Sequence, residues 1–130
     1  MVRLVNSISQ LMQDETACLD HDQLGALYAQ LGAVGAEDVV RRAMEELALR
    51  LTHAERHYRG SEFENLRKGA MSLVAISEQI GMQKVSMVAV DVATSIDQGD
   101  EVALAATLSR LLRVGERSLT AMWDLQDFTI

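Results

Sequence analysis

The sequence predicts an all-α fold, an antiparallel four-helix bundle with one or two short helices at its N-terminal end. Apolar residues recur at steps of three and four along most of the chain, which is the spacing of one face of a helix. Glycines divide this pattern into segments of helical length, at Gly32, Gly35, Gly60, Gly81 and Gly99. Proline is absent, so long helices meet no local restriction from it. With 130 residues, 48% of them hydrophobic, the chain is long enough for one domain with its own core.

The first helices flank Gly32. Asp20 precedes the segment 21–31 and Gln23 stands at the third position after it, a pattern typical of a capping box. Gly32 supplies the left-handed residue that ends such a helix. From 36 to 59 the apolar residues alternate steps of four and three, which predicts a long amphipathic helix.

Two further helices have clear starting signals. Ser61 stands three residues before Glu64, a second capping-box pattern, and the helix that it opens closes at Gly81. Asp100 is a good N-cap for a last helix that reaches about residue 124. Inside that helix, Gly115 costs about 1 kcal/mol relative to alanine and is either a close-packing site or a weak point.

The segment 83–98 fits two patterns. Val88, Val90 and Val92 alternate as they would in a strand, while the apolar residues over the whole segment also fit one helix face. We assign a helix, because a lone strand would leave its backbone groups without partners. With a further helix predicted over 2–12, we divide the chain into an N-terminal helix and connection over 1–17 and a helical bundle over 18–130.

Charge and hydropathy argue against several classes of function. The net charge of −7 has the wrong sign for tracking a nucleic-acid backbone. No apolar run approaches the roughly 18 residues that a membrane span needs, and the first residues lack the pattern of a signal peptide. The single cysteine, Cys18, has no partner for an internal disulfide, which is typical of a reducing compartment. We therefore expect a cytoplasmic protein with no nucleic-acid or membrane partner.

The order of the helices and three short fragments resemble the histidine phosphotransfer (HPt) domain family. The fragments are Leu19-Asp20, Ile80-Gly81-Met82 and Gly99-Asp100, and the similarity covers residues from about 18 to 124. The resemblance implies a bacterial phosphorelay module, a helical bundle that carries phosphate on one exposed histidine and exchanges it with receiver-domain aspartates. The implied partners are a receiver domain or a histidine kinase, and no cofactor is expected.

The family motif places lysine three residues and glycine four residues after the histidine, and a later Leu-Gly-Ala ends the helix. If that ending is anchored on Ile80-Gly81-Met82, none of the three motif positions keeps its residue. They hold Met71, Val74 and Ala75, in that order. A thioether does not accept a phosphoryl group at pH 7, and valine supplies no cation to steady one.

A rival register is anchored on Lys68-Gly69. It keeps the lysine and the glycine, but it puts Asn65 at the histidine position and Ala75 where the helix-ending glycine belongs. Neither register supplies a histidine. The sequence therefore predicts a member of the family without the phospho-accepting residue, so no catalytic residue is assigned and independent enzymatic chemistry is not expected.

What remains of the motif is a helix face, which we call the Met71 face. Its residues are Arg67, Met71, Val74, Ala75 and Glu78. On a helix these side chains lie beside the core stripe, so Met71 and Val74 are apolar residues flanked by charge. One interpretation is an exposed docking patch, for which a flexible methionine is well suited. The other is that the helix over 2–12 covers the face or that the core stripe is simply wide.

His53 and His57 stand four residues apart on the long predicted helix, so both imidazoles lie on one face. Either is a candidate for a relocated phospho-acceptor, with Arg56 and Arg59 as the neighbouring cations. No further histidine or cysteine is placed to complete a metal site, so we expect no metal and a solvated helix surface.

Three functional hypotheses follow. The main one is a non-phosphorylatable HPt-like protein that binds a receiver domain or a histidine kinase as an adaptor or inhibitor. The second is an active histidine phosphotransferase that uses His53 or His57. The third is a helical scaffold unrelated to phosphorelays, possible as a homodimer through Met71 and Val74.

Overall fold

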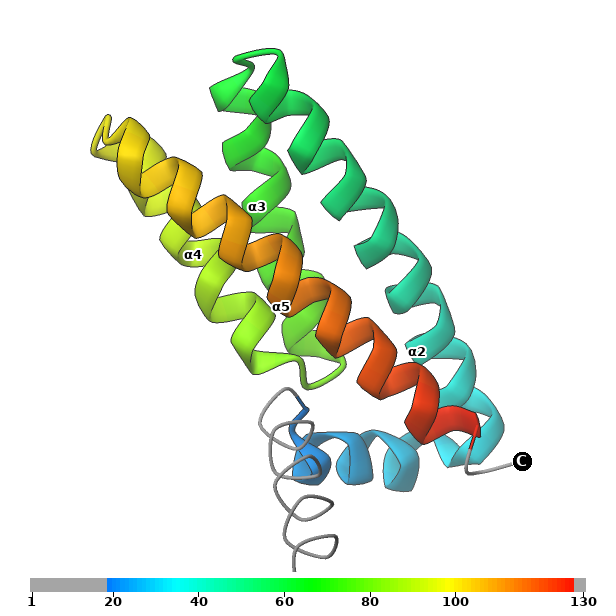
Figure 1. Cartoon of the computed structure of the whole chain (residues 1–130). Coiled ribbons are helices and arrows are strands. Elements are labelled where there is room, and N and C mark those ends of the chain that lie inside the picture. Colours follow the sequence, from blue (N-terminus) through cyan, green and yellow to red (C-terminus); the bar gives the residue numbers. More distant parts are fainter. Residues whose placement is uncertain (1–18, 128–130) are drawn as a thin grey trace, which may run out of the picture.

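The computed structural model describes residues 19–127, and every regular element in that range is an α-helix (Figure 1). The helices are α2 (His21–Arg59), α3 (Phe63–Gln79), α4 (Gln83–Asp97) and α5 (Glu101–Asp127). The predicted all-α class is confirmed, and the segment 83–98 is helical, as assigned. The predicted helix over 2–12, the domain boundary after residue 17 and Cys18 lie outside the described residues.

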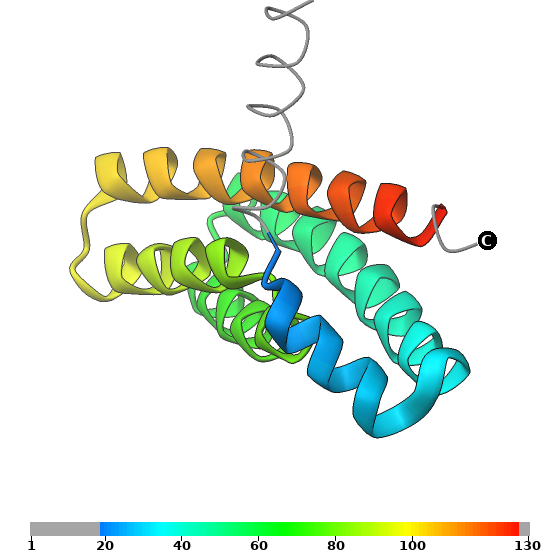
Figure 2. The same cartoon turned by 90° about the horizontal axis from the view of Figure 1, so that it is seen from below.

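Helix α2 contains both of the predicted first helices, joined at a kink. Gly32 has φ 75° and ψ 168°, a left-handed conformation that glycine adopts without steric cost. The part before the kink lies across the ends of the other helices, and the longer part after it runs beside α3 and α5 (Figure 2). At the start of α2, the Asp20 carboxylate accepts a hydrogen bond from the Gln23 backbone N–H at 3.1 Å, which confirms Asp20 as the N-cap. The reciprocal bond of a capping box does not form, because the Gln23 amide donates to the Glu78 carbonyl instead.

The start of α2 is fastened to the turn between α3 and α4. The Asp20 backbone N–H donates to the Gly81 carbonyl at 2.7 Å, and the Gln83 amide donates to the Asp20 carboxylate at 2.7 Å. Gly81 has φ 76°, and a Cβ there would lie 3.0 Å from the Asp20 carbonyl oxygen. This turn therefore needs glycine both for its backbone conformation and for the close approach of α2.

The predicted capping box at Ser61 is wrong. Ser61 itself has a left-handed φ of 56°, and the N-cap of α3 is Glu62, whose side chain makes no capping bond. Only three residues connect α2 to α3, and in this short reversal Ser61 takes the left-handed conformation in place of the extended one that is typical of an N-cap. The Glu62 carboxylate instead lies near His57 and Asn65, at 3.4 and 3.5 Å.

The core is built from aliphatic side chains of all four helices. Its largest fully buried members include Leu47, Leu66, Leu73, Ile80, Met82, Leu111 and Met122. Where α5 crosses α2, a Cβ on Gly115 would lie 2.6 Å from Leu51 Cδ1, so this glycine is a close-packing site. None of the described helices is both long enough and apolar enough to cross a membrane.

Candidate functional sites on the two sides of α3

Two polar contacts hold the ends of the Met71 face against α4. Arg67 donates from Nε and Nη2 to the two carboxylate oxygens of Asp97, at 2.7 and 3.1 Å. Near the other end of α3, the Ser86 hydroxyl donates to Glu78 Oε1 at 3.2 Å. Both contacts fit one register, in which α3 and α4 run in opposite directions and Val90 lies level with Val74.

The ion pair between Arg67 and Asp97 is exposed, and each charge has the other as its partner. The hydrogen bond from Arg67, with its charge, holds the pKa of Asp97 below its ordinary value. The same hydrogen bond and the Asp97 charge raise the pKa of Arg67. Both groups therefore stay ionised near neutral pH, and their charges cancel at the edge of the face.

Between these polar ends lie exposed apolar side chains. Met71 is 43% exposed, Val90 on α4 is 42% exposed and Met87 is 66% exposed. We call Met71, Met87 and Val90 the α3–α4 patch. Ala75 is also exposed, whereas Val74 is half-buried and packs against the core, as the wide-stripe interpretation expects.

The sequence reasoning missed Met87 and Val90. A signal for them was present, since they lie three residues apart and off the helix face that carries the buried Val85, Val88 and Val92. The strand-like alternation in this segment obscured that signal. Only the helical periodicity separates the buried valines from the exposed one.

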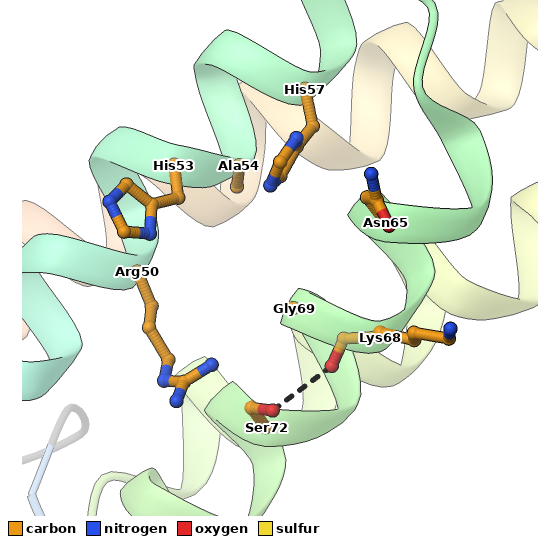
Figure 3. Close-up of a pocket in the computed structure, with 8 residues that line it drawn as sticks. All are labelled: Arg50, His53, Ala54, His57, Asn65, Lys68, Gly69 and Ser72. Atoms are coloured by element: carbon orange, nitrogen blue, oxygen red, sulfur yellow. Dashed lines mark hydrogen bonds between the residues drawn. The ribbon is translucent and has the colours of Figure 1, made fainter.

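The other side of α3 borders a hollow of about 350 Å³ between α2 and α3, which we call the α2–α3 hollow (Figure 3). Its lining residues are Arg50, His53, Ala54 and His57 from α2 and Asn65, Lys68, Gly69 and Ser72 from α3. Six of these eight side chains end in nitrogen or hydroxyl groups, and none carries a carboxylate. The hollow is therefore rich in hydrogen-bond donors.

Both predicted histidines line this hollow. Their ring centroids lie 6.4 Å apart, and the His57 ring points into the space between the helices (Figure 3). The cations predicted beside them, Arg56 and Arg59, are not among the lining residues of this hollow. Arg56 and Arg59 line a second depression on α2 that also includes His53 but not His57, and Arg59 pairs there with Glu55. The basic residues that share the hollow with His57 are Arg50 and Lys68.

The carboxylate of Glu62 lies beside one ring nitrogen of His57. His57 Nδ1 lies 3.4 Å from Glu62 Oε1. When the imidazole is neutral, a carboxylate beside Nδ1 favours the tautomer with its proton on that nitrogen, which leaves the lone pair on Nε2. The contact therefore joins a possible nucleophile to a group that can orient it.

Within residues 19–127, no group of three or more His, Cys, Asp or Glu side chains is placed to hold a metal ion. A comparison of the chain with protein-family models, curated proteins and solved structures finds no match. The candidate functional sites are the α3–α4 patch and the α2–α3 hollow, on the two sides of α3.

Proposed function

We propose that the chain is an HPt-like antiparallel four-helix bundle that binds a receiver domain or a histidine kinase of a bacterial phosphorelay, as an adaptor or inhibitor in the cytoplasm. The observation that carries the proposal is the α3–α4 patch, three exposed apolar side chains bracketed by two polar contacts. The glycine turn after Ile80, into which the start of α2 is fastened, supports the HPt-like connectivity.

The patch has the composition of a docking surface. Protein interfaces pair an apolar centre with a polar rim, and methionine adapts its shape to a partner. Here Met71, Met87 and Val90 supply the apolar side chains, two of them adaptable methionines, while Arg67 and Glu78 supply the rim. The rim charges are already paired or hydrogen-bonded, so a partner need not leave them buried and alone.

The residues at the motif positions explain why binding would occur without phosphate exchange. Met71 has no nitrogen to accept a phosphoryl group, and Val74 has no charge to steady one. A receiver domain held on this face would keep its phosphate or remain without one. The bound chain would then compete with a phosphorylatable partner for the same receiver, which is inhibition by occupancy.

A binding titration tests this proposal. The chain is titrated against each receiver domain of its own genome, phosphorylated and unphosphorylated, at physiological salt. Met71→Asp is expected to weaken binding at least about tenfold, because it places a charge at the centre of the interface. Val102→Asp is the matched control, since Val102 is an exposed apolar residue on α5 and lies outside the patch.

Unchanged binding by Met71→Asp, or equal weakening by both variants, would contradict docking through the patch. Sedimentation at two concentrations separates the proposal from a homodimer. If the patch joins two copies of the chain, the mass rises with concentration and Met71→Asp removes the rise.

A second candidate function is phosphotransfer through His57, favoured by the hollow that it lines together with Arg50 and Lys68 and by its contact with Glu62. The Nε2 lone pair would attack the phosphorus of an aspartyl phosphate. A P–N bond forms as the P–O bond to the aspartate breaks, and the aspartate leaves as a carboxylate. Glu62 holds the Nδ1 proton during this step.

Phosphorylated receiver domains test the second candidate. Acid-labile phosphate on the chain that is lost in His57→Gln and kept in His53→Gln would support His57. Loss only in His53→Gln would move the acceptor to His53, and no label on the natural chain would rule out phosphotransfer from those receivers.

A further inference from the structure

We infer that the α2–α3 hollow is a binding site for a small oxyanion of the phosphate class, held non-covalently by Arg50 and Lys68. The inference goes beyond the proposed docking function, since the hollow and the α3–α4 patch lie on different sides of α3. It requires neither a receiver domain nor a phosphorylated histidine.

The charge of the lining is the first observation. The chain as a whole has a net charge of −7, yet no carboxylate lines this hollow, and its lining residues include one basic residue from each helix, Arg50 from α2 and Lys68 from α3. A guanidinium matches the oxygens of a phosphate with two parallel N–H groups, and an ammonium adds a point charge. Two cations from separate helices can therefore contact one anion.

The hydrogen bonds around the hollow leave these cations available. Arg50 donates from Nε to Glu46 at 2.8 Å, and no hydrogen bond within residues 19–127 uses its Nη atoms. Lys68 lies 3.8 Å from Glu64, a loose and exposed pair. Its side chain extends away from the hollow (Figure 3), and an exposed lysine changes rotamer at little cost. Their acidic partners, Glu46 and Glu64, are not among the lining residues.

Gly69 is the second observation, and it is independent of charge. It lies in the interior of α3, where glycine costs about 1 kcal/mol relative to alanine. A Cβ at Gly69 would have no neighbouring atom within 4 Å, so packing does not require a glycine there. What its missing side chain does provide is room in the wall of the hollow, between Lys68 and Ser72.

The size of the hollow suits a small ligand. Its volume of about 350 Å³ lies within the range of small-molecule sites, which begins at roughly 300 Å³. Inorganic phosphate would fill only part of it. A phosphate monoester could place its organic part against Ala54 and the His53 ring. The shared chemistry of both ligands is the phosphate group.

The test is an NMR titration of the full, isotope-labelled chain with inorganic phosphate, at constant ionic strength with chloride as the replaced ion. We expect saturable shifts at the amides of Gly69 and Ser72. Arg50→Gln and Lys68→Gln are each expected to weaken binding about fivefold, since each removes one charged contact at a partly exposed site. Arg110→Gln and Lys84→Gln, which change exposed basic residues on α5 and α4, are the matched controls.

Shifts spread evenly over basic residues of the whole surface would overturn the inference, as would equal phosphate affinities for the two hollow variants, Arg50→Gln and Lys68→Gln, and their controls. A second titration with glycerol phosphate identifies the source of the phosphate group. Tighter binding than inorganic phosphate supports a monoester, and equal binding supports a site for the phosphate group alone. Met71→Asp is expected to leave both titrations unchanged, so failure of the docking proposal is distinguishable from failure of this one.

Discussion

The two sides of α3 differ in what their neighbouring helices leave exposed. On the α4 side, Arg67 is paired with Asp97 and the surface between the polar contacts is apolar. On the α2 side, the surface is polar and Lys68 has only a loose partner. Figure 1 shows α2 and α3 together at their connecting turn and farther apart beyond it. One helix thus presents a surface suited to a protein partner and a hollow suited to an anion.

The largest expected effect comes from a substitution in the buried stripe of α3, which lies between its two exposed sides. Leu73 is fully buried on the stripe between them. Leu73→Ala is expected to lower the free energy of unfolding by about 2–5 kcal/mol, through lost burial and the cavity left behind. Urea denaturation followed by circular dichroism measures it. Met71→Ala, on the same helix but exposed, is the control and should change stability by less than about 1 kcal/mol.

A second prediction concerns the close contact between Gly115 on α5 and Leu51 on α2, which contrasts with the open space of the α2–α3 hollow. At Gly115 an added methyl meets the buried Leu51 side chain, which has to shift. Gly115→Ala is expected to lower the free energy of unfolding by about 1 kcal/mol, because the overpacking outweighs the gain in helix propensity. An unchanged or raised midpoint of thermal unfolding would mean that α5 moves away at no cost.

The same substitution at Gly69 is expected to have the opposite sign. The methyl enters open space, so Gly69→Ala should raise the free energy of unfolding by about 0.5–1 kcal/mol through helix propensity alone. It should also weaken phosphate binding, because the methyl occupies the wall of the hollow. A stabilised variant with unchanged phosphate affinity would separate the glycine from the anion site.

The smallest expected effect concerns the ion pair on the α4 side. Since the pKa of Asp97 is lowered in the folded chain, the pair contributes stability above the ordinary carboxyl pKa. That contribution is lost as pH falls through the lowered value. Asp97→Asn is therefore expected to lose less stability on acidification below about pH 4 than the natural chain does. Asp91→Asn is the control, since Asp91 lies on the same helix and forms no ion pair within residues 19–127. This variant should lose as much stability on acidification as the natural chain does.

Much of the fold follows from local signals. The caps at Asp20 and Asp100 form as predicted, with bonds to the backbone N–H groups of Gln23 and Ala103. Glycine ends or bends a helix at Gly32, where φ is positive. Such signals act over three or four residues, so they can be recognised without knowing what the rest of the chain does. Ser61 is the exception, since the short reversal between two packed helices decides its conformation.

For the candidate sites too, some features follow from local sequence signals and others from the packing of the helices. The sequence by itself determined that His53 and His57 share a face of one helix and that Met71 lies beside the core stripe. Only the tertiary structure decided that Asp97, thirty residues away, would pair with Arg67, and that the histidines would line one hollow with residues of α3. The physical reason is that helix periodicity sets the direction of a side chain, whereas its partner depends on how the helices pack.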